Sequence, residues 1–309
     1  MRFVKITALV LIVLAGIAGS AWLYLTARTA VPETSDYAFD LAEIRRLAGT
    51  LPGPAPLRVN AELVAHAEIP RGGVFAGEPF EPHPMVHQSF QIVFPDRFLL
   101  LDAGFDAAMH AKMLERSGPG PPYFPDAYAR VQAALAAADA IYITHEHGDH
   151  LQGIARFTPP EALLGRLRLT PEQLGNTLRM DQVAMPQVLR DAEPFAYETY
   201  AAVAPGVVMI KAAGHTPGAH LMYVRLADGR ELLFIGDTAW HMDAIRKLHY
   251  RPRLITDHFI NEDRAAVLDQ FRTLHDLDRA HPEVRIVASH DADQRAKHAE
   301  EGLIGTGFE

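Results

Sequence analysis

Hydrophobic residues are arranged along the chain as one long uninterrupted run followed by many short ones. The long run extends from Ile6 to Leu25, and its 20 residues include no charged side chain. As a helix it would be about 30 Å long, which matches the hydrocarbon thickness of a bilayer. Arg2 and Lys5 precede it and would keep the N-terminus inside the cell. The pattern predicts a membrane helix over residues 1–25, with the body outside the cytoplasm.

Cleavage of this segment is the alternative to anchoring. Ala18-Gly19-Ser20 supplies the small residues of a signal-peptide cleavage site. The apolar run nevertheless continues through Trp22 and Tyr24, and aromatic residues at that position suit a membrane interface. We therefore expect an uncleaved anchor that holds the body on the periplasmic side of a bacterial-type cell envelope. Cleavage would instead give a secreted protein.

The short apolar runs, separated by turn residues, predict one large α/β domain over residues 58–309. Between this domain and the anchor, residues 26–57 are expected to form a linker that carries one short amphipathic helix. The elements expected within the domain are a strand at 58–69, a hairpin of strands 89–94 and 98–101, a helix at 125–138 and a hairpin of strands 220–226 and 231–235.

One of the short apolar runs ends in an unusually dense group of metal-binding residues. Ala140–Ile143 is followed within a few residues by the motif HxHxDH. Because side chains two residues apart on a strand share a face, His145 and His147 would point to the same side. The glycine of the motif would let the chain turn so that Asp149 and His150 reach the same place. The alternative is a polar loop that happens to be rich in histidine.

Three further apolar runs also lead into ligand-type residues. Residues 207–210 precede GHTPG, residues 232–235 precede GDT, and residues 285–288 precede SHD. Small residues at these strand ends permit close approach of the backbone around a compact site. Together the four strand ends supply five histidines and two aspartates, which is enough for two metal ions. The additional candidate ligands are His215, Asp237 and His290.

The ordered set HxHxDH, GHTPG, GDT and SHD resembles the metallo-β-lactamase superfamily, over the region from Gln88 to Asp291. The resemblance implies an α/β fold of four layers, an αββα sandwich of two mixed sheets covered by helices, with two metals at one edge. By position, it implies that His145, His147 and His215 hold the first metal, that Asp149, His150 and His290 hold the second, and that Asp237 bridges them.

These ligands imply a hydrolase that needs no serine or cysteine nucleophile. Imidazole and carboxylate ligands favour two zinc ions, and they also accept manganese or iron. Two such metals would share a hydroxide that attacks the substrate. Asp237 would hold this pair together, and Asp149 either passes a proton to the leaving group or is only a ligand. An HExxH zinc-protease motif around Glu146 fails, because position 149 is aspartate.

The motifs most resemble lactonases that open acyl-homoserine lactones and their esterase relatives. We therefore expect hydrolysis of a lactone, ester or thioester. A tyrosine that many such lactonases carry after the bridging aspartate is replaced here by Ala239, Trp240 and His241, which puts that role in doubt. The alternatives are a phosphodiesterase or phosphotriesterase, a β-lactamase, and a non-catalytic envelope protein that keeps the fold for binding.

Composition limits the partners. The net charge is −9 and no basic run is present, which argues against nucleic acid and favours a small-molecule substrate. The absence of cysteine excludes disulfides. The predicted partners are a small-molecule substrate and the membrane, and the sequence does not fix the oligomeric state.

Two regions are expected to be less ordered and to set specificity: residues 72–88, and a lid or insertion at 157–205. The second region contains apolar residues that would form either a wall over the metals or ordinary core. Histidines at 87, 220 and 241 are candidates for orienting a ligand or the substrate. The apolar residues concerned are Met180, Met185, Leu189, Phe195, Tyr197 and Tyr200.

Overall fold

The computed structural model describes residues 2–115 and 120–309. Met1 of the expected anchor and residues 116–119 of the expected domain lie outside the described residues. The helices are α1 (Arg2–Thr26), α2 (Leu41–Ala48), α3 (Arg71–Val74), α4 (Ala107–Leu114), α5 (Pro125–Ala137), α6 (Gly148–Ala155), α7 (Pro171–Gly175), α8 (Thr177–Gln182), α9 (Gln187–Arg190), α10 (Met242–Arg246), α11 (Arg253–Ile255), α12 (Arg264–Ala280) and α13 (Ala292–Glu300), with shorter turns η1 (Pro160–Leu163), η2 (Gly236–Thr238) and the π-helical η3 (Thr256–Ile260).

Within residues 2–115 and 120–309, ten strands form two sheets of five, in the orders β10-β1-β2-β3-β4 and β5-β6-β7-β8-β9. In the first sheet both edge pairs, β10 with β1 and β3 with β4, are parallel, and the pairs between them are antiparallel. The second sheet is antiparallel except for its edge pair, β8 with β9. The strands are β1 (Arg58–Pro70), β2 (Pro82–Val93), β3 (Phe98–Leu101), β4 (Ala140–Tyr142), β5 (Tyr200–Ala204), β6 (Val207–Lys211), β7 (His220–Arg225), β8 (Glu231–Phe234), β9 (Val284–Val287) and β10 (Gly305–Thr306).

Alternate side chains of each strand enter different cores. On β3, Leu99 and Leu101 lie between the two sheets, whereas Leu100 packs outward against α5 and α6. On β6, Met209 lies between the sheets, and Ile210 packs outward against the helices of the second sheet. This alternation follows from the strand geometry, because successive side chains point to opposite faces. The helix–sheet–sheet–helix layering predicted from the sequence is confirmed.

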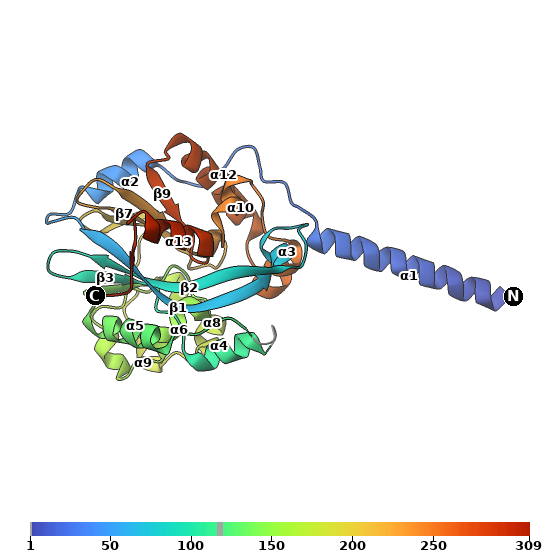
Figure 1. Ribbon diagram of the computed structural model, residues 1–309, viewed down its shortest axis with the longest axis horizontal. Coiled ribbons are helices and arrows are strands. Elements are labelled where there is room, and N and C mark those ends of the chain that lie inside the picture. Colours follow the sequence, from blue (N-terminus) through green and yellow to red (C-terminus); the bar gives the residue numbers. More distant parts are fainter. Residues whose placement is uncertain (1, 116–119) are drawn as a thin grey trace.

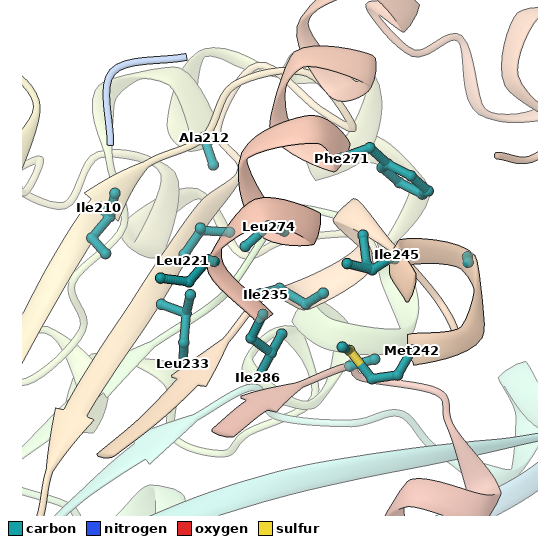
Figure 2. Packing of buried hydrophobic residues seen from close by; sticks show 14 of the residues in the cluster. Ile210, Ala212, Leu221, Leu233, Ile235, Met242, Ile245, Phe271, Leu274 and Ile286 are labelled. Carbon is teal, nitrogen blue, oxygen red and sulfur yellow. The ribbon is translucent and has the colours of Figure 1, made fainter. Parts of the chain in front are cut away.

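Figure 2 shows the outer core of the second sheet. Leu221, Leu233 and Ile286 come from three neighbouring strands and belong to one buried cluster with Leu274 and Phe271 of α12. All five side chains are almost completely buried. The second sheet is therefore held against α12 by a continuous apolar layer.

The predicted apolar N-terminal helix is present as α1, which projects from one end of the body near α3 (Figure 1). It is the one helix in the described part of the chain that is long and apolar enough to cross a membrane, and its window Leu9–Thr26 is not buried by the rest of the protein. Its C-terminal end contacts the body, where Trp22 packs on Phe80 with ring centroids 5.8 Å apart.

Residues 27–57 lie on the second sheet and its helices. Thr29 accepts a hydrogen bond from Arg264, and Ser35 donates one to the carbonyl of Asp269, so the chain is tied to α12 along its polar part. In α2, which corresponds to the predicted amphipathic helix, Ile44 and Ala48 enter the outer core.

The segment at 72–88 is more regular than we expected from its sequence. Residues from Pro82 onward belong to β2, which pairs with β1 from Arg58↔Val93 to Pro70↔Pro82. The proline and histidine content suggested a loop, but this strand is covered on one side by α13 and is held by its long partner. Tertiary pairing thus overrides weak local propensity.

The apolar residues at 180–200 form core rather than a wall over the site. Met180, Met185 and Leu189 pack with α5 and α6 beneath the first sheet. Phe195 and Tyr197 pack against the cluster between the sheets, and Tyr200 packs against the outer core of the second sheet. The pocket-wall interpretation of these six residues is therefore wrong.

Candidate metal centre

The seven predicted ligands meet at one edge of the sandwich, and each sheet contributes some of them. His145 and His147 follow β4 of the first sheet, and Asp149 and His150 lie in the first turn of α6, which comes next in the chain. His215 follows β6, Asp237 lies in η2 after β8, and His290 follows β9, so these three come from the second sheet.

Four side chains converge as a first group. His147 Nδ1 lies 3.0 Å from His145 Nε2 and 3.0 Å from His215 Nε2. Oδ2 of Asp237 lies 3.7 Å from His145 Nε2 and 3.5 Å from His215 Nε2. Three imidazole nitrogens and one carboxylate oxygen therefore face a common point.

A second group uses the other oxygen of the same aspartate. Oδ1 of Asp237 lies 3.4 Å from His150 Nε2 and 3.0 Å from His290 Nε2. Oδ2 of Asp149 lies 3.4 Å and 3.5 Å from the same two nitrogens. Asp237 thus offers one oxygen to each group and stands between them.

These atoms fit a pair of divalent metal ions. Ligands about 2.0–2.2 Å from a tetrahedral zinc would be roughly 3.3–3.6 Å apart, and the separations above bracket that value. Within the described residues, His150 Nε2 and Asp237 Oδ1 are buried without a hydrogen-bond partner. A buried imidazole nitrogen and carboxylate oxygen without partners are strongly unfavourable unless a cation satisfies them.

Comparison with known families agrees with this geometry. The profile of a beta-lactamase superfamily domain matches residues 97–291, which is more than half of the chain. The chain belongs to the metallo-β-lactamase superfamily. No curated protein sequence shows significant similarity to it.

Solved structures of other superfamily members show the same fold at low identity. An N-acyl homoserine lactone hydrolase with N-hexanoyl-L-homoserine at its catalytic metal centre aligns with a TM-score of 0.62 and 14% identity, over 79% of this chain and 96% of that one. A probable metal-dependent hydrolase from Staphylococcus aureus gives 0.55 and 13%, over 76% and 90%. AidC, a dizinc quorum-quenching lactonase, gives 0.51 and 13%, over 78% and 91%.

A buried aspartate contacts His150, a member of the second ligand group, on the side of the ring that faces away from the site. Asp102 follows β3, and its Oδ2 lies 2.9 Å from His150 Nδ1. Its other oxygen accepts a hydrogen bond from the Thr144 backbone N–H at 2.7 Å. Asp102 therefore fixes the ring of His150 so that Nε2 faces the site, as carboxylate partners of metal-binding histidines generally do.

Glu262, which was not among the residues predicted from the sequence, supports the first group in the same way. Its Oε1 lies 2.8 Å from His215 Nδ1 and 2.6 Å from an Nη of Arg251. The hydroxyl of Tyr250 donates to the other carboxylate oxygen. Arg251 also donates to the Asp237 backbone carbonyl at 3.0 Å. One buried ion pair thus holds His215 and the loop of Asp237 together.

The side chain of Trp240, three residues after Asp237, also contacts this aspartate. Nε1 of Trp240 donates to Asp237 Oδ2 at 2.8 Å, and the guanidinium of Arg251 stacks over the same indole at 4.7 Å. Trp240 thus holds the Asp237 carboxylate in orientation.

Of the three histidines considered for a supporting role, His87 lies at the site. Its Nδ1 is 3.2 Å from Asp149 Oδ2, and its ring packs on that of His290 with centroids 4.7 Å apart. Among the described residues, neither His220 nor His241 forms a hydrogen bond or ion pair with any of the seven candidate ligands.

Glu146 lies within the histidine motif but points away from both groups. Its carboxylate accepts hydrogen bonds from the Thr216 hydroxyl at 2.6 Å and from the Gly218 backbone N–H at 3.1 Å. It therefore ties the first histidine loop to the loop of His215. This structural role explains why Glu146, which lies between His145 and His147 in the sequence, is not itself a candidate ligand.

Electrostatics in the site favour cations. Burial lowers the pKa of His145 and of His147 well below its usual value, which keeps these imidazoles in the neutral form that binds metals. Burial also opposes a charge on His150, but the carboxylates around it, Asp102 foremost, outweigh burial and raise its pKa well above normal. Although burial alone would raise the pKa of Asp237, the surrounding imidazoles hold it well below normal. The site thus contains buried, ionised carboxylates, which a bound cation would stabilise.

A cavity of about 350 Å³ opens beside His215. Leu178 and Arg179 of α8 line one side, and Ile260 and Asn261 at the end of η3 line the other. Nη2 of Arg179 donates to the Ile260 carbonyl at 3.2 Å and so connects the two sides. The cavity has room for a small organic substrate beside the first group of ligands.

Close packing beneath α6 keeps the histidine motif in place. The backbone N–H of Gly153 donates to the Gly104 carbonyl at 2.9 Å, and a Cβ at Gly153 would overlap the carbonyl oxygen of Ala103. We expect Gly153→Ala to lower the free energy of unfolding by about 1–3 kcal/mol, since α6 must shift. Gly165→Ala is the control because a Cβ there meets open space. Equal denaturant midpoints for the two variants would contradict this account.

Proposed function

We propose that the protein is a dinuclear-metal hydrolase that cleaves a lactone, ester or thioester. One observation carries the proposal: Asp237 directs its two oxygens to two separate groups of metal-binding side chains. His145, His147 and His215 would hold one ion, and Asp149, His150 and His290 would hold the other. Zinc is the expected metal, with manganese or iron as alternatives for the same donor atoms.

The side chains divide the work around these ions. When bound, the two ions would polarise the substrate carbonyl and supply a water molecule of lowered pKa as the attacking group. Asp102, Glu262 and Trp240 keep His150, His215 and Asp237 in orientation, so little rearrangement is needed on binding. Asp149 is partly exposed, and its carboxylate would accept a proton from the attacking water and pass it to the leaving oxygen when the bond between carbon and that oxygen breaks.

A phosphodiester or phosphotriester is the second candidate substrate. Arg179 supports the phosphodiester in particular, because this guanidinium lines the cavity next to the ligands and would attract the anionic phosphate of a diester. Burial lowers the pKa of Arg179, yet arginine remains charged at neutral pH. An ester with a carboxylate or phosphate elsewhere in the molecule would use the same cation, so we rank carboxylic ester cleavage first.

We also propose that the protein is anchored in a bacterial-type cell envelope through residues 1–25, with residues 26–57 as connection and residues 58–309 as the periplasmic catalytic body. The length and the apolar character of α1 support this placement. Alkaline phosphatase fusions at Thr34 and at the C-terminus should both be active. Inactive fusions would overturn the proposed orientation.

A substrate panel tests the proposed chemistry. The full-length protein, metal-loaded in detergent micelles, should hydrolyse acyl-homoserine lactones, aryl esters or aryl thioesters. A chelator should abolish this turnover, and added zinc or manganese should restore it. Turnover of bis-aryl phosphates without turnover of esters would reverse our ranking. Hydrolysis of β-lactams alone would point to that alternative, and no hydrolysis by fully loaded protein would favour a binding function.

A further inference from the structure

The cavity beside His215 lies close to the membrane helix. One side of the cavity ends at Ile260, and the helical segment α11–η3 leads from there back to Arg253. The guanidinium of Arg253 stacks over the ring of Tyr24 in α1 at 4.8 Å. The eight residues of this segment would rise about 12 Å along a helix. The cavity rim is therefore within roughly that distance of the end of the membrane helix.

The most exposed apolar side chains of the body are gathered in the same place. Outside α1, the three most exposed large hydrophobic residues among those described are Phe259 at 67%, Leu178 at 63% and Phe80 at 54%. Phe259 lies next to Ile260 in η3, Leu178 lines the opposite side of the cavity, and Phe80 packs on Trp22 of α1. Single exposed hydrophobics are common, but three at one end beside a membrane helix indicate contact with lipid.

The expected depth of α1 agrees with that contact. Trp22 and Tyr24 are near the C-terminal end of α1, where aromatic residues occupy the interface between hydrocarbon and headgroups. The headgroup region on each side of a bilayer is about 5–7 Å thick. Phe80, in contact with Trp22, would lie in this region, and η3 would lie at its outer edge, from which the side chain of Phe259 would reach into it. Figure 1 shows α1 leaving the body at the end where β1 and β2 turn at α3.

We propose that the metal centre faces the bilayer and acts on an amphiphile taken from it, whose acyl chain passes between α8 and η3 while its polar part reaches Arg179 and the metal ligands. This inference rests on the proposed hydrolase function and specifies its substrate class. The reaction remains the addition of water to an ester carbonyl, with proton transfer to the leaving oxygen. Burial of Phe259 in the interface would favour this orientation of the body.

The position of Phe259 can be measured without any assay of activity. Because the chain contains no cysteine, Phe259→Cys provides a single site for a bimane label on the full-length protein. In phosphatidylcholine vesicles with brominated acyl chains, we expect quenching of this label. Leu57→Cys is the matched control: Leu57 is also exposed, but it precedes β1 at the end opposite Pro70, roughly 40 Å along the strand. Equal fluorescence with and without bromine at position 259 would overturn the proposal.

Kinetics test the consequence for the substrate. In the same vesicles, Phe259→Glu should lower kcat/KM for a long-chain acyl ester by at least about tenfold, because a charge now opposes interfacial burial. Turnover of a short-chain, water-soluble ester should change by no more than about twofold, and Leu57→Glu should affect neither substrate. If the soluble ester is cleaved but Phe259→Glu does not lower kcat/KM for the long-chain ester more than for the short-chain ester, the membrane inference is wrong and the proposed hydrolase function stands. If neither ester is cleaved by metal-loaded protein, the proposed function fails.

Discussion

Asp237→Ala is expected to remove most of the bound metal and nearly all turnover. The variant deletes one oxygen from each ligand group at once, since Oδ2 faces His145 and His215 while Oδ1 faces His150 and His290. Loss of an outer partner alone typically reduces metal affinity or activity 10–100-fold, so loss of a shared ligand should reduce turnover by more than about 100-fold. Elemental analysis of the dialysed protein and ester hydrolysis would measure the two effects.

Asp228→Ala provides the control for this substitution. Asp228 lies in the exposed turn between β7 and β8, where it pairs with Arg230. It is nine residues from Asp237 in the sequence, but it is not one of the candidate ligands. Its metal content and turnover should match those of the unchanged protein. If Asp237→Ala also retained two metal equivalents and normal turnover, the bridging role of this aspartate would be refuted.

Glu262→Ala is expected to damage both stability and metal binding. The Glu262 carboxylate is buried and partners the buried guanidinium of Arg251, so its removal leaves an uncompensated charge inside the protein. Breaking such a pair typically destabilises a protein by about 3–5 kcal/mol. His215 would also lose the partner of its Nδ1, which should weaken metal affinity about 10–100-fold. Chemical denaturation and competition with a zinc chelator would measure these changes.

Two comparisons separate these effects. Glu283→Ala breaks an exposed pair with Arg45 and should change the free energy of unfolding by less than about 1 kcal/mol. Glu262→Gln keeps the shape and hydrogen-bonding capacity at His215 but loses the charge opposite Arg251. We expect it to bind metal better than Glu262→Ala. A Glu262→Ala protein as stable as Glu283→Ala would show that the buried pair contributes little.

Local pattern was sufficient to predict much of the fold. The hairpin at 220–235, the strand at 98–101 and the helix at 125–138 were predicted close to their observed bounds, because alternation and turn residues such as Asp228 and Gly229 are local signals. The strand predicted at 89–94 begins earlier, at Pro82. The short strand β10 was not predicted, since Gly305 and Thr306 form a strand only by pairing with Asn60 and Ala61. The region at 72–88 was misjudged for the same reason, as its order depends on β1.

The candidate ligands followed from strand ends, but their supporting residues did not. Asp102 and Glu262 are 48 and 47 residues away from the histidines that they orient. Asp102 gave one usable signal, because it ends a strand and precedes Ala103-Gly104. Glu262 follows the irregular η3 and resembles any surface glutamate in sequence. Only the tertiary fold brings it to His215.

The origin of the ligands has a consequence for folding. Each group combines side chains that follow β4 with side chains that follow strands of the other sheet, so an ion in either group would cross-link the two halves of the sandwich. A ligand bound only by the native state, at about 1,000 times its dissociation constant, stabilises that state by about 4 kcal/mol. The ions would therefore link the two halves in a chain without disulfides. Removal of metal would then destabilise the whole fold as well as abolish hydrolysis.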